Sequence, residues 1–134
     1  MRLIKFRGLC VKDGCGSKWV YGDLLRETYI TNKKLTIIHN LESADINTKV
    51  TPETVGQLTG LVDKNGKEIY EDDILFILEN VYLVEWRNGI CCYVLMAAEG
   101  NDIPLLSNLS KVIIGNIHEN PEIMEKKHDY HVNP

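Results

Sequence analysis

The chain has 134 residues, of which 44% are hydrophobic and 25% charged, and a formal net charge of −4. This composition is typical of one soluble domain, or of two small ones that share a core, and such a chain needs no metal or disulfide to fold. It has no apolar run of the roughly 18 to 20 residues that a membrane span requires, and no readable signal peptide, so we expect a cytoplasmic protein without membrane contact.

The residue pattern of the first half of the sequence predicts short strands. Apolar clusters rich in Val, Ile, Tyr and Trp lie between Gly, Asn and Asp residues, a pattern typical of a mainly β protein. We expect strands near residues 3–9, 18–21, 28–30 and 35–39. Residues 13–16 form a loop in which two glycines permit positive φ. Residues 22–27 are compatible with a helical turn, and residues 41–49 with a connection.

The second half begins with a helical turn, because Thr51 is a favoured N-cap and Pro52 a favoured first helical residue. A strand at 57–62 follows, and then the pair Asn65-Gly66, which predicts a tight turn because both residues tolerate positive φ. Asp73 stands just before the next strand, where its carboxylate can accept backbone N–H bonds and fasten the turn. Four further strands are predicted at 74–78, 81–86, 90–97 and 112–118.

These elements predict an all-β protein. We expect an irregular N-terminal β part at residues 1–50, an SH3-like small barrel at residues 51–123, and a flexible tail at residues 124–134. Five short antiparallel strands suit a small barrel, because closing the sheet removes its exposed edges.

Charge is distributed unevenly along the chain. Residues 1–50 carry nine cations and five anions, a net charge of +4, whereas residues 51–134 carry six cations and fourteen anions, a net charge of −8. Such asymmetry favours attraction between the two halves, within or between chains, or contact of the first half with an acidic partner. Solvation of both halves would also account for it.

The residues that usually carry chemistry form no convincing site. Cys10, Cys15, Cys91 and Cys92 are interpreted as free thiols; a zinc ion held by Cys10, Cys15 and a distant histidine is the alternative. The cluster Glu71-Asp72-Asp73 could hold a divalent cation, but a turn role is favoured. The four histidines have no visible nucleophile beside them. We therefore predict that the protein is not an enzyme and that it has no catalytic residue, metal or cofactor.

Aromatic and cationic residues alternate in the first half, a mixture that single-stranded nucleic acid binding uses, with bases stacked on rings and phosphates near cations. The alternative is that the rings fill a small β core and the cations are its solvated face. The candidate binding residues are Arg7, Lys18, Trp19, Tyr21, Lys33 and Lys34.

Residues 52–78, which read PETVGQLTGLVDKNGKEIYEDDILFIL, resemble the hallmark of the YopX family of phage and prophage proteins. Similar motifs occur at residues 4–7, 84–86 and 115–122, so the resemblance runs from Arg2 to Ile123. It departs at Asp72, where the family's turn more often has Gly, and in the region of residues 41–51. The resemblance implies a largely β phage protein that tends to form multimers, and it implies no activity.

Our leading interpretation is a non-enzymatic, multimeric accessory protein that binds other protein chains, from the phage, the host or its own copies. The alternative is a protein that binds single-stranded DNA or RNA through the basic and aromatic N-terminal residues.

Overall fold

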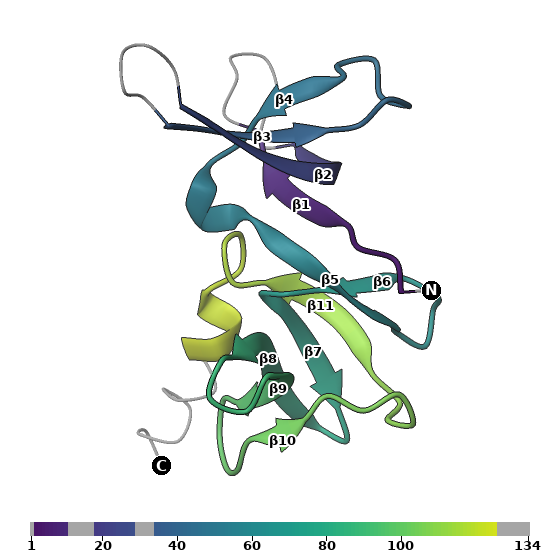
Figure 1. The fold of residues 1–134 in the computed structure, drawn as a ribbon. Coiled ribbons are helices and arrows are strands. Elements are labelled where there is room, and N and C mark those ends of the chain that lie inside the picture. Colours follow the sequence, from purple (N-terminus) through teal and green to yellow (C-terminus); the bar gives the residue numbers. More distant parts are fainter. Residues whose placement is uncertain (1, 11–17, 29–33, 126–134) are drawn as a thin grey trace. The chain divides into compact units, whose positions relative to one another are not determined.

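The computed structural model describes residues 2–10, 18–28 and 34–125 (Figure 1). It confirms the predicted all-β class. The chain divides into two compact units, Met1–Leu58 (unit 1) and Thr59–Pro134 (unit 2), so the division falls inside strand β5, Gly56–Val62. Residues 126–134, most of the predicted tail, lie outside the described residues. No helix among those described is long and apolar enough to cross a membrane.

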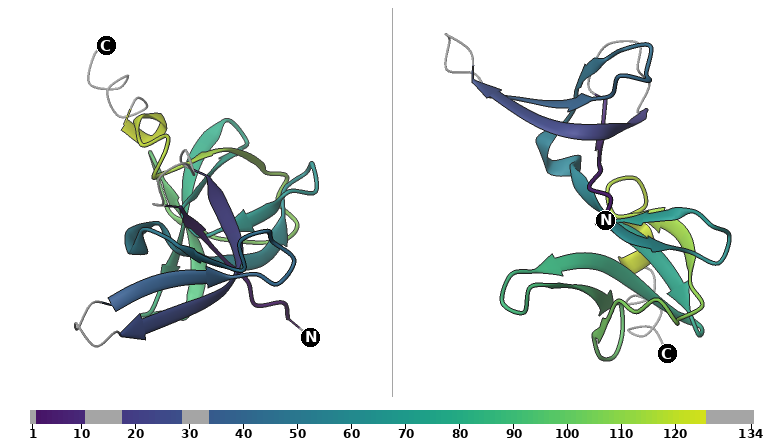
Figure 2. Two further views of the ribbon diagram at one scale, coloured as in Figure 1. Left: turned by 90° about the horizontal axis from the view of Figure 1, so that it is seen from above. Right: turned by 45° about the vertical axis from the view of Figure 1, so that its right-hand side comes forward.

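Unit 1 is built from four antiparallel strands: β1 (Phe6–Leu9), β2 (Trp19–Thr28), β3 (Lys34–His39) and β4 (Asn47–Lys49). The long strand β2 pairs with β1 through residues 19–22 and with β3 through residues 23–28, so the β2–β3 hairpin extends past β1 (Figure 2). Strand β4 pairs with β3, and a bridge between Cys10 and Val50 joins the end of β1 to the residue that follows β4. This bridge links the first and last strands of the unit.

The core of unit 1 lies between these strands. Ile38 and Val50 are each only 1% exposed. A Cβ atom at Gly8 would lie 2.7 Å from a methyl group of Val50, so the valine side chain occupies the space that a larger residue would need. Close packing of this kind explains why β1 carries glycine at this position.

The predicted helical turn is present as a 3₁₀ turn, Pro52–Thr54, but its capping differs from the prediction. The Thr51 side chain makes no capping hydrogen bond. Instead the Thr54 hydroxyl donates to the Thr51 carbonyl oxygen at 2.6 Å and accepts from the Leu9 amide at 2.9 Å. The turn thereby fastens the end of β1, which also pairs with β5.

Unit 2 contains the second sheet. Its strands are β6 (Glu68–Tyr70), β7 (Asp73–Ile77), β8 (Asn80–Arg87), β9 (Cys92–Ala97), β10 (Ile103–Pro104) and β11 (Val112–Asn116). Five of them form an antiparallel sheet in the order β10-β9-β8-β7-β11, whereas β6 is the neighbour of β5 in a six-stranded sheet of order β4-β3-β2-β1-β5-β6. The described residues thus form two antiparallel sheets, and a closed SH3-like barrel is not confirmed. The core includes the fully buried Ile69, Leu75, Val84 and Leu95.

Three local predictions need correction. Residues 22–27 form no helical turn but continue β2, because Asp23 to Thr28 pair in register with β3. Within the predicted connection at 41–49, residues 47–49 form β4. The short strands β6 and β10 were not predicted, since two or three residues are too few to show an alternating pattern.

Candidate functional site

The acidic cluster at residues 71–73 lies at the turn between β6 and β7. Asp73 is 2% exposed, and its Oδ2 accepts a hydrogen bond from the Tyr70 amide at 2.8 Å. This is the turn-fastening role considered for Asp73. Asp72 adopts a positive φ of 73°, a conformation that aspartate tolerates better than most residues.

Asp72 connects this turn to the closing motif of the chain. Its Oδ2 lies 2.9 Å from Nε2 of His118, and its carbonyl oxygen accepts from the Ile117 amide at 2.9 Å. Within the closing motif, Asn116 Oδ1 accepts from the amides of His118 and Glu119. The Asp72 side chain therefore links this turn to His118.

A second turn is organised by Asp63, which the sequence analysis did not single out. Its Oδ1 accepts from the amides of Asn65 and Lys67, each at 2.9 Å, and its Oδ2 accepts from the Ile113 amide of β11 at 3.2 Å. Burial raises the pKa of Asp63, but these backbone hydrogen bonds outweigh it and leave the pKa below its ordinary value. Gly66 has the expected positive φ of 81°; Asn65 does not, so only one residue of the pair uses this conformation.

Lys111 is buried just before β11 and also has a structural role. Its Nζ donates to the carbonyl oxygens of Leu106 and Leu109 at 3.0 and 2.8 Å. Desolvation lowers the pKa of Lys111, against a smaller opposing effect of Asp63. Through these hydrogen bonds the ammonium group of Lys111 holds the loop that contains Leu106 and Leu109 close to the start of β11. Asp63, Asp73 and Lys111 therefore each have a structural role in a turn or loop of unit 2.

The candidate binding residues of unit 1 lie mainly on β1 and β2. Arg7 is only 7% exposed, and its guanidinium carbon lies 4.6 Å from the centre of the Trp19 ring. Lys5 lies 5.9 Å from the centre of the Tyr21 ring in the same way. Both cations thus contact rings of their own chain. Burial of Arg7 argues against a direct phosphate contact at this residue.

The remaining candidate cations are distributed differently. Lys18 is exposed and directly precedes β2. Lys33 lies outside the described residues, and Lys34 begins β3, with no side-chain environment described. Among the described residues, the structure brings together Arg7, Trp19 and Tyr21. Nucleic-acid binding by the full set stays a prediction.

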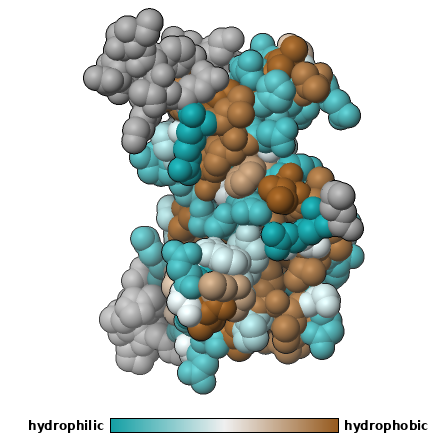
Figure 3. Space-filling view, in the orientation of Figure 1, coloured by the Kyte–Doolittle hydropathy of each residue, from teal (hydrophilic) through white to brown (hydrophobic). Residues whose placement is uncertain are grey.

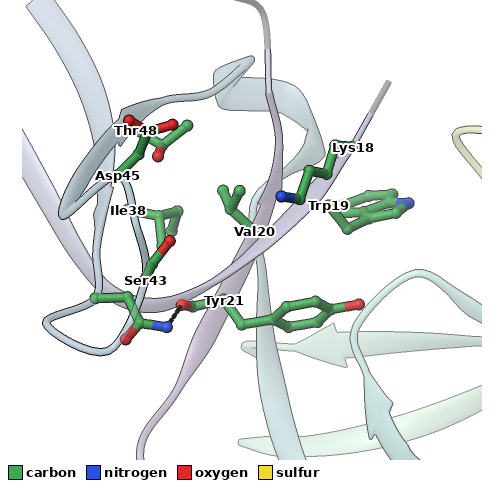
Figure 4. A pocket seen from close by; sticks show the side chains of 9 residues that line it. Lys18, Trp19, Val20, Tyr21, Ile38, Ser43, Asp45 and Thr48 are labelled. Atoms are coloured by element: carbon green, nitrogen blue, oxygen red, sulfur yellow. Dashed lines mark hydrogen bonds between the residues drawn. The ribbon is translucent and has the colours of Figure 1, made fainter. Parts of the chain in front are cut away.

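A small hollow of about 170 Å³ adjoins these residues (Figure 4). Its lining consists of Lys18, Trp19, Val20, Tyr21, Ile38, Asn40, Ser43, Asp45 and Thr48, and the rings of Trp19 and Tyr21 lie on one side of it. The Asn40 amide nitrogen donates to the Tyr21 carbonyl oxygen at 2.8 Å and fixes the loop after β3 against β2.

A larger hollow of about 640 Å³ shares Tyr21 and Asn40 with the smaller one. We call it the apolar hollow, because exposed Leu3 (60%), Ile4 (54%) and Leu41 (76%) contribute to its lining. Figure 3 shows apolar surface on both units. The full lining of the apolar hollow consists of Leu3, Ile4, Lys5, Tyr21, Gly22, Asp23, His39, Asn40, Leu41 and Glu42. Sequence reasoning missed this site because its residues come from three separate segments.

The cysteines differ from the expectation of four free thiols. Cys91 and Cys92 are free, as predicted. Cys10 is buried and disulfide-bonded, so the prediction is wrong there. The number and spacing of cysteines in a sequence do not show which sulfur atoms the fold brings within bonding distance. Cys15 lies outside the described residues, and no group of three or more metal-ligating side chains occurs among those described.

Comparison with known proteins agrees with the resemblance seen in the motifs. The family model described as "YopX protein" matches residues 5–125. The chain belongs to the YopX family. No curated protein matches it. The solved structure of protein EF1440 from Enterococcus faecalis is similar, with 20% sequence identity, a TM-score of 0.48, and coverage of 92% of this chain and 99% of that chain.

Proposed function

We propose that this YopX-family chain is a non-enzymatic, phage- or prophage-encoded accessory protein that acts in the host cytoplasm by binding protein chains, its own copies included. The observation that carries the proposal is the separation of charge between its compact units. Unit 1 has nine cations and six anions, a net charge of +3, and unit 2 has six cations and thirteen anions, a net charge of −7. Opposite fields on two units favour association between chains.

Exposed apolar side chains supply the second requirement of a protein interface. Leu41 in unit 1 and Leu78 in unit 2 are 76% and 81% exposed, and neither fills a core. Apolar groups of this size at the surface are typical of protein contacts when they gather in a patch. We include in this proposal that the strands of residues 51–123 close into an SH3-like barrel, since small barrels commonly bind peptides.

The test compares two double variants, each of which replaces two cations of one unit by glutamate. The double substitution Lys18→Glu with Arg26→Glu, at exposed positions, changes unit 1 from +3 to −1. The matched control, Lys64→Glu with Lys67→Glu, gives the same overall charge but makes unit 2 more negative. We expect size-exclusion chromatography with light scattering to give a lower molar mass for the first variant than for the wild type, because its multimer dissociates. The control should have the molar mass of the wild-type multimer.

The same runs, recorded at 260 and 280 nm without nuclease treatment, test the alternative function. Nucleic-acid binding predicts excess absorbance at 260 nm that high salt removes and that the Lys18, Arg26 variant lacks. A wild-type protein that is monomeric and free of nucleic acid would contradict self-association and leave only heterologous protein partners.

A further inference from the structure

The tip of the β7–β8 hairpin carries an apolar residue that the fold does not require. Ile77 pairs with Asn80, so Leu78 and Glu79 form a two-residue loop, and both have positive φ, 46° and 68°. Such loops favour Asn-Gly, because a larger side chain in the left-handed conformation meets its own backbone. Leu78 is nevertheless 81% exposed. Neither backbone preference nor burial within the described structure accounts for leucine here.

The apolar hollow in unit 1 has the complementary property. Leu3, Ile4 and Leu41 leave apolar surface open around a depression of about 640 Å³, which exceeds the volume of a single leucine side chain. Lys5, His39, Asp23 and Glu42 contribute to the same lining, so basic and acidic side chains both border it. A short apolar side chain such as Leu78 matches the apolar part of this depression, and the net charge of unit 2, which carries Leu78, is opposite to that of unit 1.

We propose that the β7–β8 tip of one copy inserts Leu78 into the apolar hollow of a second copy. The inference rests on the proposed function and names the two surfaces that carry it. Because the tip and the hollow are different surfaces, the contact is head-to-tail, and each chain offers one of each. Repetition of this contact builds a ring if the rotation closes and a filament if it does not.

Two single substitutions test the two surfaces separately, one at the β7–β8 tip and one in the apolar hollow. Leu78→Asn deletes the apolar tip with a residue that the left-handed loop prefers, so the variant should fold at least as well as the wild type. Leu41→Asp places a charge in the hollow at a residue that is 76% exposed. The control is Ile90→Asn, at a 63% exposed position in the neighbouring β8–β9 loop. Thermal unfolding of each variant checks that the fold is kept.

We expect light scattering to give the 15.3 kDa monomer for Leu78→Asn and for Leu41→Asp alone, and the wild-type multimer for Ile90→Asn. The decisive step is mixing. The Leu78→Asn chain keeps an intact hollow and the Leu41→Asp chain keeps an intact tip, so an equimolar mixture should form a dimer with about twice the monomer mass. A symmetric contact between identical surfaces would not be restored by mixing.

The outcomes separate this inference from the proposed function. A wild-type multimer that persists in Leu78→Asn or in Leu41→Asp overturns the tip-in-hollow contact and leaves self-association standing. Two monomeric variants that stay monomeric when mixed overturn the head-to-tail arrangement. A monomeric wild type, by contrast, removes self-association itself and the inference with it.

Discussion

Gly22 lies where β2 leaves β1 and begins to pair with β3, and this change of partner explains the glycine. Phe6 pairs with Gly22, and the next residue, Asp23, pairs with His39. A Cβ atom at Gly22 would lie 2.2 Å from the His39 carbonyl oxygen, a backbone atom that cannot move away cheaply. The close approach of β3 at this point is therefore available only to glycine.

We predict that Gly22→Ala destabilises the protein by at least about 3 kcal/mol, because overpacking here displaces backbone rather than a flexible side chain. Urea unfolding followed by circular dichroism measures the change. Gly89→Ala is the matched control, since nothing lies within 4 Å of a Cβ atom at Gly89 and the change should stay within about 0.5 kcal/mol. Equal effects of the two substitutions would contradict the packing argument.

Asp63 shows how one carboxylate links a turn to a distant strand. Both of its oxygens accept backbone hydrogen bonds, from residues 65 and 67 in the turn and from residue 113 in β11. Asparagine has one acceptor oxygen and would direct its NH₂ group toward an N–H donor. We therefore expect Asp63→Asn to cost about 2 kcal/mol at pH 7.

The pKa of Asp63 predicts how this difference depends on pH. Because the folded-state pKa lies below the ordinary value of 3.8, the ionised carboxylate contributes its full stability above pH 3.8, and this contribution is lost as the pH falls through the folded-state pKa. The gap in unfolding free energy between wild type and Asp63→Asn should thus narrow in acid. Urea titrations at pH 7 and at successively lower pH measure it, and a gap independent of pH would contradict the assignment.

At the scale of elements, the sequence predicted strands best where their apolar residues are contiguous. Strand β7 has four of its five residues buried and was expected within one residue of its observed start. Strand β2 was broken in two by the prediction, because Gly22 and the polar residues after it resemble a turn, whereas pairing with β3 keeps the strand extended. Pairing between distant segments thus overrides the local preference of the residues.

The candidate surfaces were less predictable than the strands. The apolar hollow combines residues 3–5, 21–23 and 39–42, which only the folded strands bring together. The predicted strands at 74–78 and 81–86 leave residues 79 and 80 between them, but the observed β7–β8 loop is Leu78-Glu79. Neither residue of that loop is a typical turn former, so sequence preference alone places the tip one residue too late.

At the scale of the whole molecule, the separation of charge is also present between the compact units, although it is slightly smaller than for the division at residue 50, where +4 stands against −8. The boundary at Leu58 and Thr59 assigns Glu53 to unit 1, which still keeps a net charge of +3 against −7 in unit 2. In a head-to-tail contact these two charges face each other between chains. Electrostatic attraction then assists encounter, while the apolar tip and hollow provide contact area that salt does not weaken.

This division of roles predicts a graded response to salt. Between 0.1 and 1 M NaCl the screening length falls from about 10 Å to about 3 Å, so the charge attraction is largely lost. We expect the dissociation constant of the multimer to rise about tenfold, equivalent to about 1.4 kcal/mol, rather than association being abolished. Sedimentation velocity over a concentration series measures it. The Lys18→Glu, Arg26→Glu variant should associate more weakly than the wild type, and its dissociation constant should change less with salt. If association of the wild type instead strengthens with salt, attraction between the unlike units has no part in assembly.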